Sequence, residues 1–232
     1  MKTILLVALI GAFANFDRRT SLRLMFSQPI CTGFLTGVVM GLPMQGFMFG
    51  AVLQMMILGV VSVRGSLVPE FEIGGVVGTA LYLSALRFSA MDISVEGAIF
   101  FVAIAVILLV STLSALIYRV WERKSSVLAD YAVSLVRSGK VGRVSTIHTI
   151  NIFAHFLAGG IITILFLLIF TPVVKAIVGW HGVDSMRGLS SLEVLLPFIG
   201  AGFLVTFLNS RMKFFWYAVG FLVTVVLAFS VG

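Results

Sequence analysis

Polar side chains that lie in or beside long apolar stretches are the candidates for chemistry in this sequence. Four of them fall within one short window, at Gln54, Arg64, Glu70 and Glu72. Amides and carboxylates can hydrogen-bond the hydroxyl groups of an uncharged sugar, while an apolar or aromatic side chain covers the ring. This window therefore predicts a sugar-binding site. The alternative is a structural ion pair of Arg64 with Glu70 or Glu72 at the edge of a membrane.

The three histidines, His148, His155 and His181, are candidates for metal binding or proton transfer. His148 and His155 are seven residues apart, which places them near one face of a helix, but no carboxylate or thiol accompanies them. Two hydrogen-bonding histidines inside a helical bundle are the preferred interpretation, and a metal pair is the alternative. The chain has no GKS or GKT loop, HExxH or GxSxG motif, so we predict no catalytic residue, metal or cofactor.

The composition identifies the setting in which these residues act. Hydrophobic residues make up 60% of the 232 residues and charged residues 11%, against about 45 to 50% and about 25% in soluble domains. This indicates an integral membrane protein. The formal charge of +7 comes from short basic tracts between apolar runs, which favours a role in membrane orientation over nucleic-acid binding. Cys31 is the single cysteine, so an intrachain disulfide is excluded.

Charged residues divide the chain into apolar segments that can be compared with the roughly 20 residues of a membrane-crossing helix. Several segments are shorter than this, which predicts broken or re-entrant helices near the functional centre. We therefore expect an all-α integral membrane protein, a polytopic bundle formed by one domain over residues 1–232. The candidate segments are 3–15, 29–42, 44–63, 73–86, 97–118, 146–174, 194–210 and 214–232.

A helical hairpin is predicted within the region 26–72. Pro43 lacks a backbone donor and should break the helix between two arms. Glycines recur at four-residue spacing in each arm, at Gly33 and Gly37 and then at Gly46 and Gly50. Such stripes of small residues let helix backbones approach closely in membranes. The alternative is two ordinary, tightly packed membrane spans.

The basic tracts predict the orientation of the chain, because loops rich in Lys and Arg stay on the cytoplasmic side. The longest polar stretch, 119–145, should be a cytoplasmic connection, and both chain termini should lie outside the cytoplasm. An amphipathic helix lying against the membrane or a partner is plausible within 119–145, and a solvated helix without a partner is the alternative. A cleaved signal peptide at the N-terminus is a competing interpretation of the first segment.

One stretch of the sequence resembles a known family. It runs from Phe26-Ser-Gln-Pro29 through the glycine stripe to Gln54-Met55, Leu58-Gly59 and Val68-Pro69-Glu70. This resembles the IIC component, or permease subunit, of the mannose/fructose/sorbose family of the phosphoenolpyruvate-dependent sugar phosphotransferase system. The family pattern runs roughly F-x-R-P, G-x-x-x-G, then G-x-x-x-G-x-x-x-E-M-x-x-L-G and A-P-D. Weaker matches are Ile147-His148 and the region from Asn209 to Phe221.

The chain departs from this pattern at several positions. Gln54 stands in place of a glutamate, Glu70 in place of an aspartate and Arg64 in place of a glycine. The acidic residue that usually precedes the F-x-R-P element is displaced to Asp17 or missing. An amide in place of a carboxylate removes a charged acceptor and adds a donor, so these departures bear on the substrate and on its coupling to phosphorylation.

The resemblance implies a multi-pass translocator subunit in a bacterial cytoplasmic (inner) membrane that binds a hexose-class sugar. It implies a IID membrane subunit as partner, soluble IIB and IIA subunits, and a trimer of IIC-IID pairs, with phosphorylation carried out by IIB. The alternatives are a non-transporting sugar sensor or scaffold derived from the same fold and, less favoured, an intramembrane enzyme. No nucleic acid is expected. The predicted sugar-binding residues are Gln54, Glu70, Glu72, His148 and Asn209.

Overall fold

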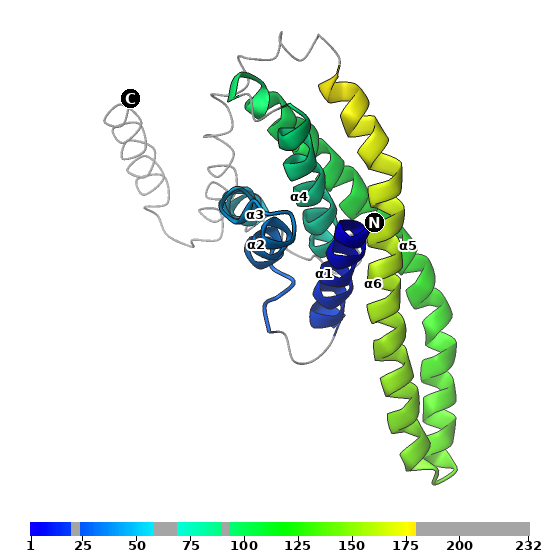
Figure 1. Cartoon of the computed structure of the whole chain (residues 1–232). Coiled ribbons are helices and arrows are strands. Elements are labelled where there is room, and N and C mark those ends of the chain that lie inside the picture. The colour runs from blue at the N-terminus through cyan, green and yellow to red at the C-terminus, as the bar shows by residue number, and fades with distance from the viewer. Residues whose placement is uncertain (20–23, 58–68, 90–92, 180–232) are drawn as a thin grey trace, which may run out of the picture.

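The computed structural model describes residues 1–19, 24–57, 69–89 and 93–179. All the regular structure in these ranges is helical, which agrees with the predicted fold class (Figure 1). The helices are α1 (Lys2–Arg19), α2 (Pro29–Val39), α3 (Pro43–Ile57), α4 (Phe71–Phe88), α5 (Ile93–Arg137) and α6 (Val141–Val178). The predicted segments 194–210 and 214–232, and with them Asn209, lie outside the described residues.

Two of the described helices are long and apolar enough to cross a membrane by length and composition. These stretches are Glu96–Arg123 in α5 and Gly142–Val178 in α6. Figure 1 shows α5 and α6 running side by side as the longest elements of the molecule. They are connected by a tight turn at Ser138 to Lys140, in which Gly139 has a φ of 75°. Glycine adopts this left-handed conformation without steric cost.

The stretch 119–145 is formed by the continuations of two long helices. It forms no separate surface helix, because α5 continues without interruption to Arg137 and α6 begins at Val141. Beyond Tyr118 the two helices form a protruding hairpin, about 28 Å long at 1.5 Å per residue. Figure 1 shows this part extending past the other helices. We call it the α5–α6 extension.

Helices α1 and α4 are longer than their apolar segments suggested. Each has 18 residues, about 27 Å at 1.5 Å per residue. The segments were cut at charged residues, but Asp17 and Glu72 are buried inside the protein and continue the helices. Charge therefore marks a helix end only where the side chain faces water or lipid headgroups.

The first helix is an integral part of the helical bundle. It packs along α6 through small residues, where a side chain at Gly11 would collide with Thr163 and one at Gly159 would collide with the Cβ of Asn15. Such close contact stabilises helix pairs in membranes through dispersion and short polar contacts. Residues 2–19 are thus closely packed against α6.

Helices α2 and α3 form the hairpin that Pro43 predicts. Their backbones are in contact at the glycine stripe: a Cβ at Gly33 would lie 2.5 Å from the carbonyl oxygen of Gly46, and one at Gly37 would lie 2.7 Å from the Leu42 oxygen. The arms have 11 and 15 residues, about 16 and 22 Å. Neither arm alone reaches across the roughly 30 Å hydrocarbon core of a bilayer.

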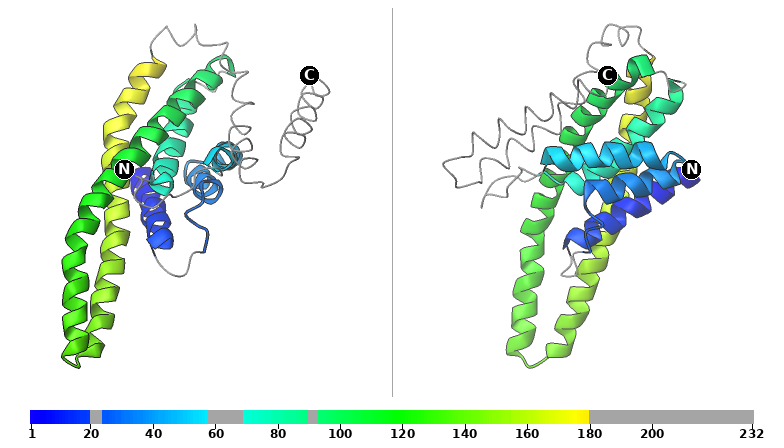
Figure 2. Two further views of the ribbon diagram at one scale, coloured as in Figure 1. Left: turned by 180° about the vertical axis from the view of Figure 1, so that it is seen from behind. Right: turned by 90° about the vertical axis from the view of Figure 1, so that its left-hand side faces the viewer.

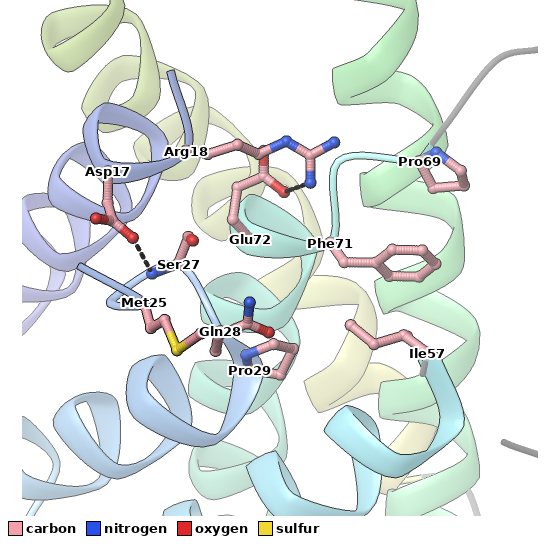
Figure 3. A pocket seen from close by; sticks show the side chains of 10 residues that line it. All are labelled: Asp17, Arg18, Met25, Ser27, Gln28, Pro29, Ile57, Pro69, Phe71 and Glu72. Carbon is pink, nitrogen blue, oxygen red and sulfur yellow. Dashed lines mark hydrogen bonds and ion pairs between the residues drawn. The ribbon is translucent and has the colours of Figure 1, made fainter. Parts of the chain in front are cut away.

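The hairpin lies crosswise to α5, as the right-hand view in Figure 2 shows. Its tip is tied to the end of α4, because the Arg87 guanidinium donates to the Met40 carbonyl. The other end of the hairpin lies near the start of α4, around Gln28 and Ile57 (Figure 3). Buried almost completely, α4 is the central helix, and stacked rings of Phe49 and Tyr82 join it to α3. The hairpin thus packs against α4 and borders an open space at the end that carries Gln28 and Ile57.

Candidate functional site

A cluster of charged residues joins the end of α1, the start of α4 and the middle of α5. The Arg18 guanidinium contacts Glu72 at 3.1 Å and Glu70 at 3.5 Å. Arg19 donates to Glu70 at 2.7 Å and to Glu122 at 2.6 Å. Two arginines thus face three carboxylates, and the charge is largely balanced inside the cluster.

Helix α4 positions the two acidic residues. Its first turn follows Pro69, and the Glu70 backbone N–H donates to the Ser111 carbonyl of α5 at 3.0 Å. Glu72 lies in the first helical turn, where exposed backbone N–H groups and the helix dipole stabilise a negative charge. Its residue exposure is only 1%. A carboxylate this buried requires the Arg18 guanidinium beside it.

A cavity of about 510 Å³ opens between this cluster and the hairpin (Figure 3). Its polar wall includes Glu72, Arg18 and Gln28, and its apolar wall includes Phe71 and Ile57. Donors, acceptors and an aromatic ring thus border one space that is large enough for a monosaccharide. The complete lining is Asp17, Arg18, Met25, Ser27, Gln28, Pro29, Ile57, Pro69, Phe71 and Glu72.

Asp17 shapes the loop that forms one wall of the cavity. Its two carboxylate oxygens accept hydrogen bonds from the backbone N–H groups of Leu24, at 2.5 Å, and Ser27, at 3.0 Å. Between these donors Met25 has a φ of 65°, a left-handed conformation that is costly for a residue with a side chain. Asp17 therefore stabilises a strained turn, and through it the position of Gln28.

Two amides join the open end of the hairpin. The Nε2 of Gln54, in α3, donates to the Oε1 of Gln28, at the start of α2, over 2.8 Å. Gln28 lines the cavity, whereas Gln54 lies behind it. In Figure 3 the Gln28 amide nitrogen points toward the side of the cavity that Glu72 lines.

A second polar cluster lies behind the arginines. Arg19 lies over the ring of Tyr118, 4.3 Å from its centroid, and that ring is 6.1 Å from the ring of His155. Asn15 donates to the His155 backbone carbonyl at 2.5 Å. This cluster holds α1 against α5 and α6, and the Tyr118 ring supports the Arg19 guanidinium.

The predicted sugar-binding residues fall into three groups. Glu72 lines the cavity, Glu70 lies beside it in the charged cluster, and Gln54 is one hydrogen bond away. His148 is exposed on α6 and is not among the residues that line this cavity. Asn209 lies outside the described residues.

Sequence reasoning missed Arg18 and Gln28 as members of the site. It considered Arg64 as the partner of Glu70 and Glu72; Arg64 lies outside the described residues, and Arg18 and Arg19 pair with both carboxylates. Gln28 carried a usable signal, because it stands at the arginine position of the F-x-R-P pattern while Gln54 stands at its glutamate position. Both positions are charged in the family pattern, and both carry an amide in this chain. Because the two amides bond to each other, they indicate a coupled pair.

Within the described parts of the chain, no group of three or more metal-ligating side chains is found. His155 is surrounded by aromatic rings, at Tyr118 and Trp121. The arrangement of the site is thus one of hydrogen-bond donors and acceptors around an open cavity. It can bind a neutral polar ligand without a metal ion among these residues.

Comparisons with known proteins found similarities that extend over nearly the whole chain. A family model described as "PTS system sorbose-specific iic component" matches residues 1–232. A solved structure described as a membrane protein is similar with a TM-score of 0.66 at 18% identity, over 100% of this chain and 95% of that chain. A chain in the cryo-EM structure of mannose transporter ManYZ with microcin E492 is similar with a TM-score of 0.56 at 19% identity, over 99% and 92%. No curated protein sequence matches.

Proposed function

The chain belongs to the family of sorbose-specific IIC components of the phosphotransferase system, and from this premise we propose that it binds a neutral hexose in the cavity beside Glu72. As a member of this family it is a membrane translocator component of multi-pass type. The observation that carries the proposal is the cavity itself. It combines carboxylate acceptors, amide and guanidinium donors and an aromatic ring in about 510 Å³.

Each part of the cavity suits a part of a sugar. The Glu72 carboxylate accepts hydrogen bonds from hydroxyl groups, and the amide of Gln28 and the guanidinium of Arg18 donate to hydroxyl oxygens. Phe71 offers a ring face to the apolar side of the pyranose or furanose. Glu70 and Gln54 support these groups from behind. The proposed site retains three predicted residues, and no contact in this cavity supports His148.

For the sugar to bind, the Glu72 carboxylate must accept hydrogen bonds from the sugar as well as from the Arg18 guanidinium. The Arg18 side chain is 39% exposed, whereas that of Glu72 is 1% exposed. An arginine with this freedom can move toward water while the buried carboxylate stays in place. Sugar hydroxyl groups then take over part of the hydrogen bonding that the guanidinium gives up.

The proposed partners follow from the family and from a structural relative. The related structure contains the mannose transporter ManYZ, and we infer that this chain pairs with a IID membrane subunit and that the pairs form a trimer. Soluble IIA and IIB subunits would pass a phosphoryl group to the sugar on the cytoplasmic face of a bacterial inner membrane. This chain itself would bind the sugar and let it cross the membrane, and IIB would transfer the phosphoryl group to the sugar.

Sugar uptake and phosphorylation by membranes that contain this chain with its IID and IIB partners test the proposal. We expect uptake of at least one of mannose, fructose and sorbose, with the phosphorylated sugar as product. Binding without uptake would instead support a non-transporting sugar sensor. If none of the three sugars bound, the proposed function would be wrong.

A further inference from the structure

Gln28 and Gln54, the two amides at the open end of the hairpin, occupy different positions relative to the cavity. Gln28 lines the cavity, and its Oε1 accepts the hydrogen bond from Gln54 Nε2 at 2.8 Å. Because an amide has one acceptor oxygen and one donor nitrogen, this bond turns the Gln28 N–H groups the other way. Figure 3 shows the nitrogen directed toward the Glu72 side of the cavity.

The structure gives Gln28 no other task that would explain its side chain. It is the N-terminal cap residue of α2, yet its side chain makes no capping hydrogen bond there. Proline at the next position already removes one of the unpaired backbone donors of the helix start. The amide is therefore available to a ligand, and its loss should leave α2 intact.

Gln54 has a different position. It lies in α3, outside the cavity lining, and its Oε1 is buried without a hydrogen-bond partner among the described residues. Because Gln54 is not among the residues that line the cavity, it acts on a ligand there through Gln28, the group that it holds.

We propose that Gln28 is a specificity-determining residue that donates to a sugar hydroxyl, and that Gln54 is a positioning residue that fixes which end of the Gln28 amide faces the sugar. The inference rests on the proposed function, since it names a further contact of that same site. The pair carries no charge. It lets the cavity accept an uncharged hydroxyl beside the Glu72 carboxylate without adding a competing ion.

The test is a double-mutant cycle on the assembled protein with its membrane partner. The variants are Gln28→Met, Gln54→Met and both together, and the probe is whichever of mannose, fructose and sorbose binds the unaltered protein most tightly. Gln28→Met should weaken binding about tenfold or more, because a sugar hydroxyl loses its donor. Gln54→Met should weaken it less, and the double variant should be no worse than Gln28→Met.

A matched control and a second readout separate this role from a structural one. Gln45→Met makes the same change in the first turn of α3, at the other end of the hairpin, and should leave binding unchanged. Gln54→Glu keeps a bond only if Gln28 turns its nitrogen to the new carboxylate, so the cavity gains an acceptor in place of a donor. The ratio of affinities for glucosamine and for the neutral sugar should then rise, since an ammonium group donates hydrogen bonds.

The outcomes are distinct. Additive losses in the double variant would overturn the positioning role of Gln54, and unchanged binding by Gln28→Met would overturn the contact by Gln28. An unchanged ratio in Gln54→Glu would count against the amide orientation. If the unaltered protein bound none of the three sugars, the proposed function itself would fail, and this assignment with it.

Discussion

Glu72 shows how one residue can serve both the fold and the site. It is buried in the central helix, it pairs with Arg18 of α1, and it lines an open cavity. A buried carboxylate with a partner that reaches solvent can exchange that partner for a ligand at modest cost, because the negative charge is never left without a donor. The charge at this position should therefore matter more for binding than for folding.

Removing that charge gives the first prediction. Glu72→Gln keeps the size of the side chain but loses a charged acceptor, so sugar affinity should fall about tenfold to a hundredfold. Arg18 retains Glu70 at 3.5 Å, and the protein should still fold and insert. Calorimetric titration of the assembled protein measures the effect. Asp130→Asn on the exposed α5–α6 extension is the matched control; equal affinities for both variants would remove Glu72 from the site.

Among the elements, the α2–α3 hairpin depends most directly on the sequence pattern. Its glycines place backbone against backbone, so the two arms move as one body. It packs against α4 through the stacked rings of Phe49 and Tyr82, and it is linked at its ends by the Arg87 contact at the tip and by the loop that Asp17 holds. A hairpin held in this way is suited to carry Gln28 and Ile57 at the cavity without distortion.

Adding one methyl group to the hairpin gives the second prediction. In Gly33→Ala the new Cβ would lie 2.5 Å from the Gly46 carbonyl oxygen, and the arms must separate. We expect a loss of about 1 to 3 kcal/mol of stability, seen as a lower midpoint of thermal unfolding in detergent. Gly142→Ala is the control, because a Cβ there meets nothing within 4 Å and should be neutral or slightly stabilising. Equal midpoints for both variants would contradict the backbone contact.

The sequence alone predicts the hairpin but not the charged cluster. Pro43 and the four-residue spacing of glycines act locally, so the break and the close packing could be read from the chain. The pairing of Glu70 and Glu72 with Arg18 and Arg19 joins residues more than 50 positions apart, and composition and spacing do not encode such contacts. For the same reason, cutting segments at charges shortened α1 and α4 and divided α5 at Tyr118.

At the scale of the whole molecule, three of the described helices meet at one charged cluster. The end of α1, the start of α4 and the Tyr118 region of α5 meet there, and the α5–α6 extension continues beyond it (Figure 1). Its basic residues include Arg137, Lys140 and Arg143. By the rule that basic segments stay inside, we propose that the side of the molecule with the α5–α6 extension faces the cytoplasm.

Labelling from outside intact cells gives the third prediction. In a Cys31→Ser background, a cysteine at the exposed Ser138 should react with an impermeant maleimide only after the cells are opened. A cysteine at the exposed Thr3, at the opposite end of α1, should react in intact cells and serves as the control. The reverse pattern would invert the orientation of the molecule.

Expression without a partner gives the fourth prediction. The cavity brings Glu72 and Arg18 next to open space at the edge of the described helices, and polar groups of this kind are unstable against lipid. The chain alone should be unstable or inactive in membranes, and co-expression with a IID subunit should restore a stable assembly in native mass measurements. A stable, sugar-binding monomer would contradict this expectation.

The pairing of Arg18 with Glu72 also has a consequence for biosynthesis. The ribosome makes Arg18 54 residues before Glu72, and α2 and α3 emerge in between. An unpaired carboxylate is costly inside a bilayer, so α4 can settle there only while α1 is still beside the insertion machinery. Integration of this chain should therefore proceed as one coupled event over its first four helices. In a nascent chain halted after α4, replacing Arg18 by alanine should release α4 from the membrane.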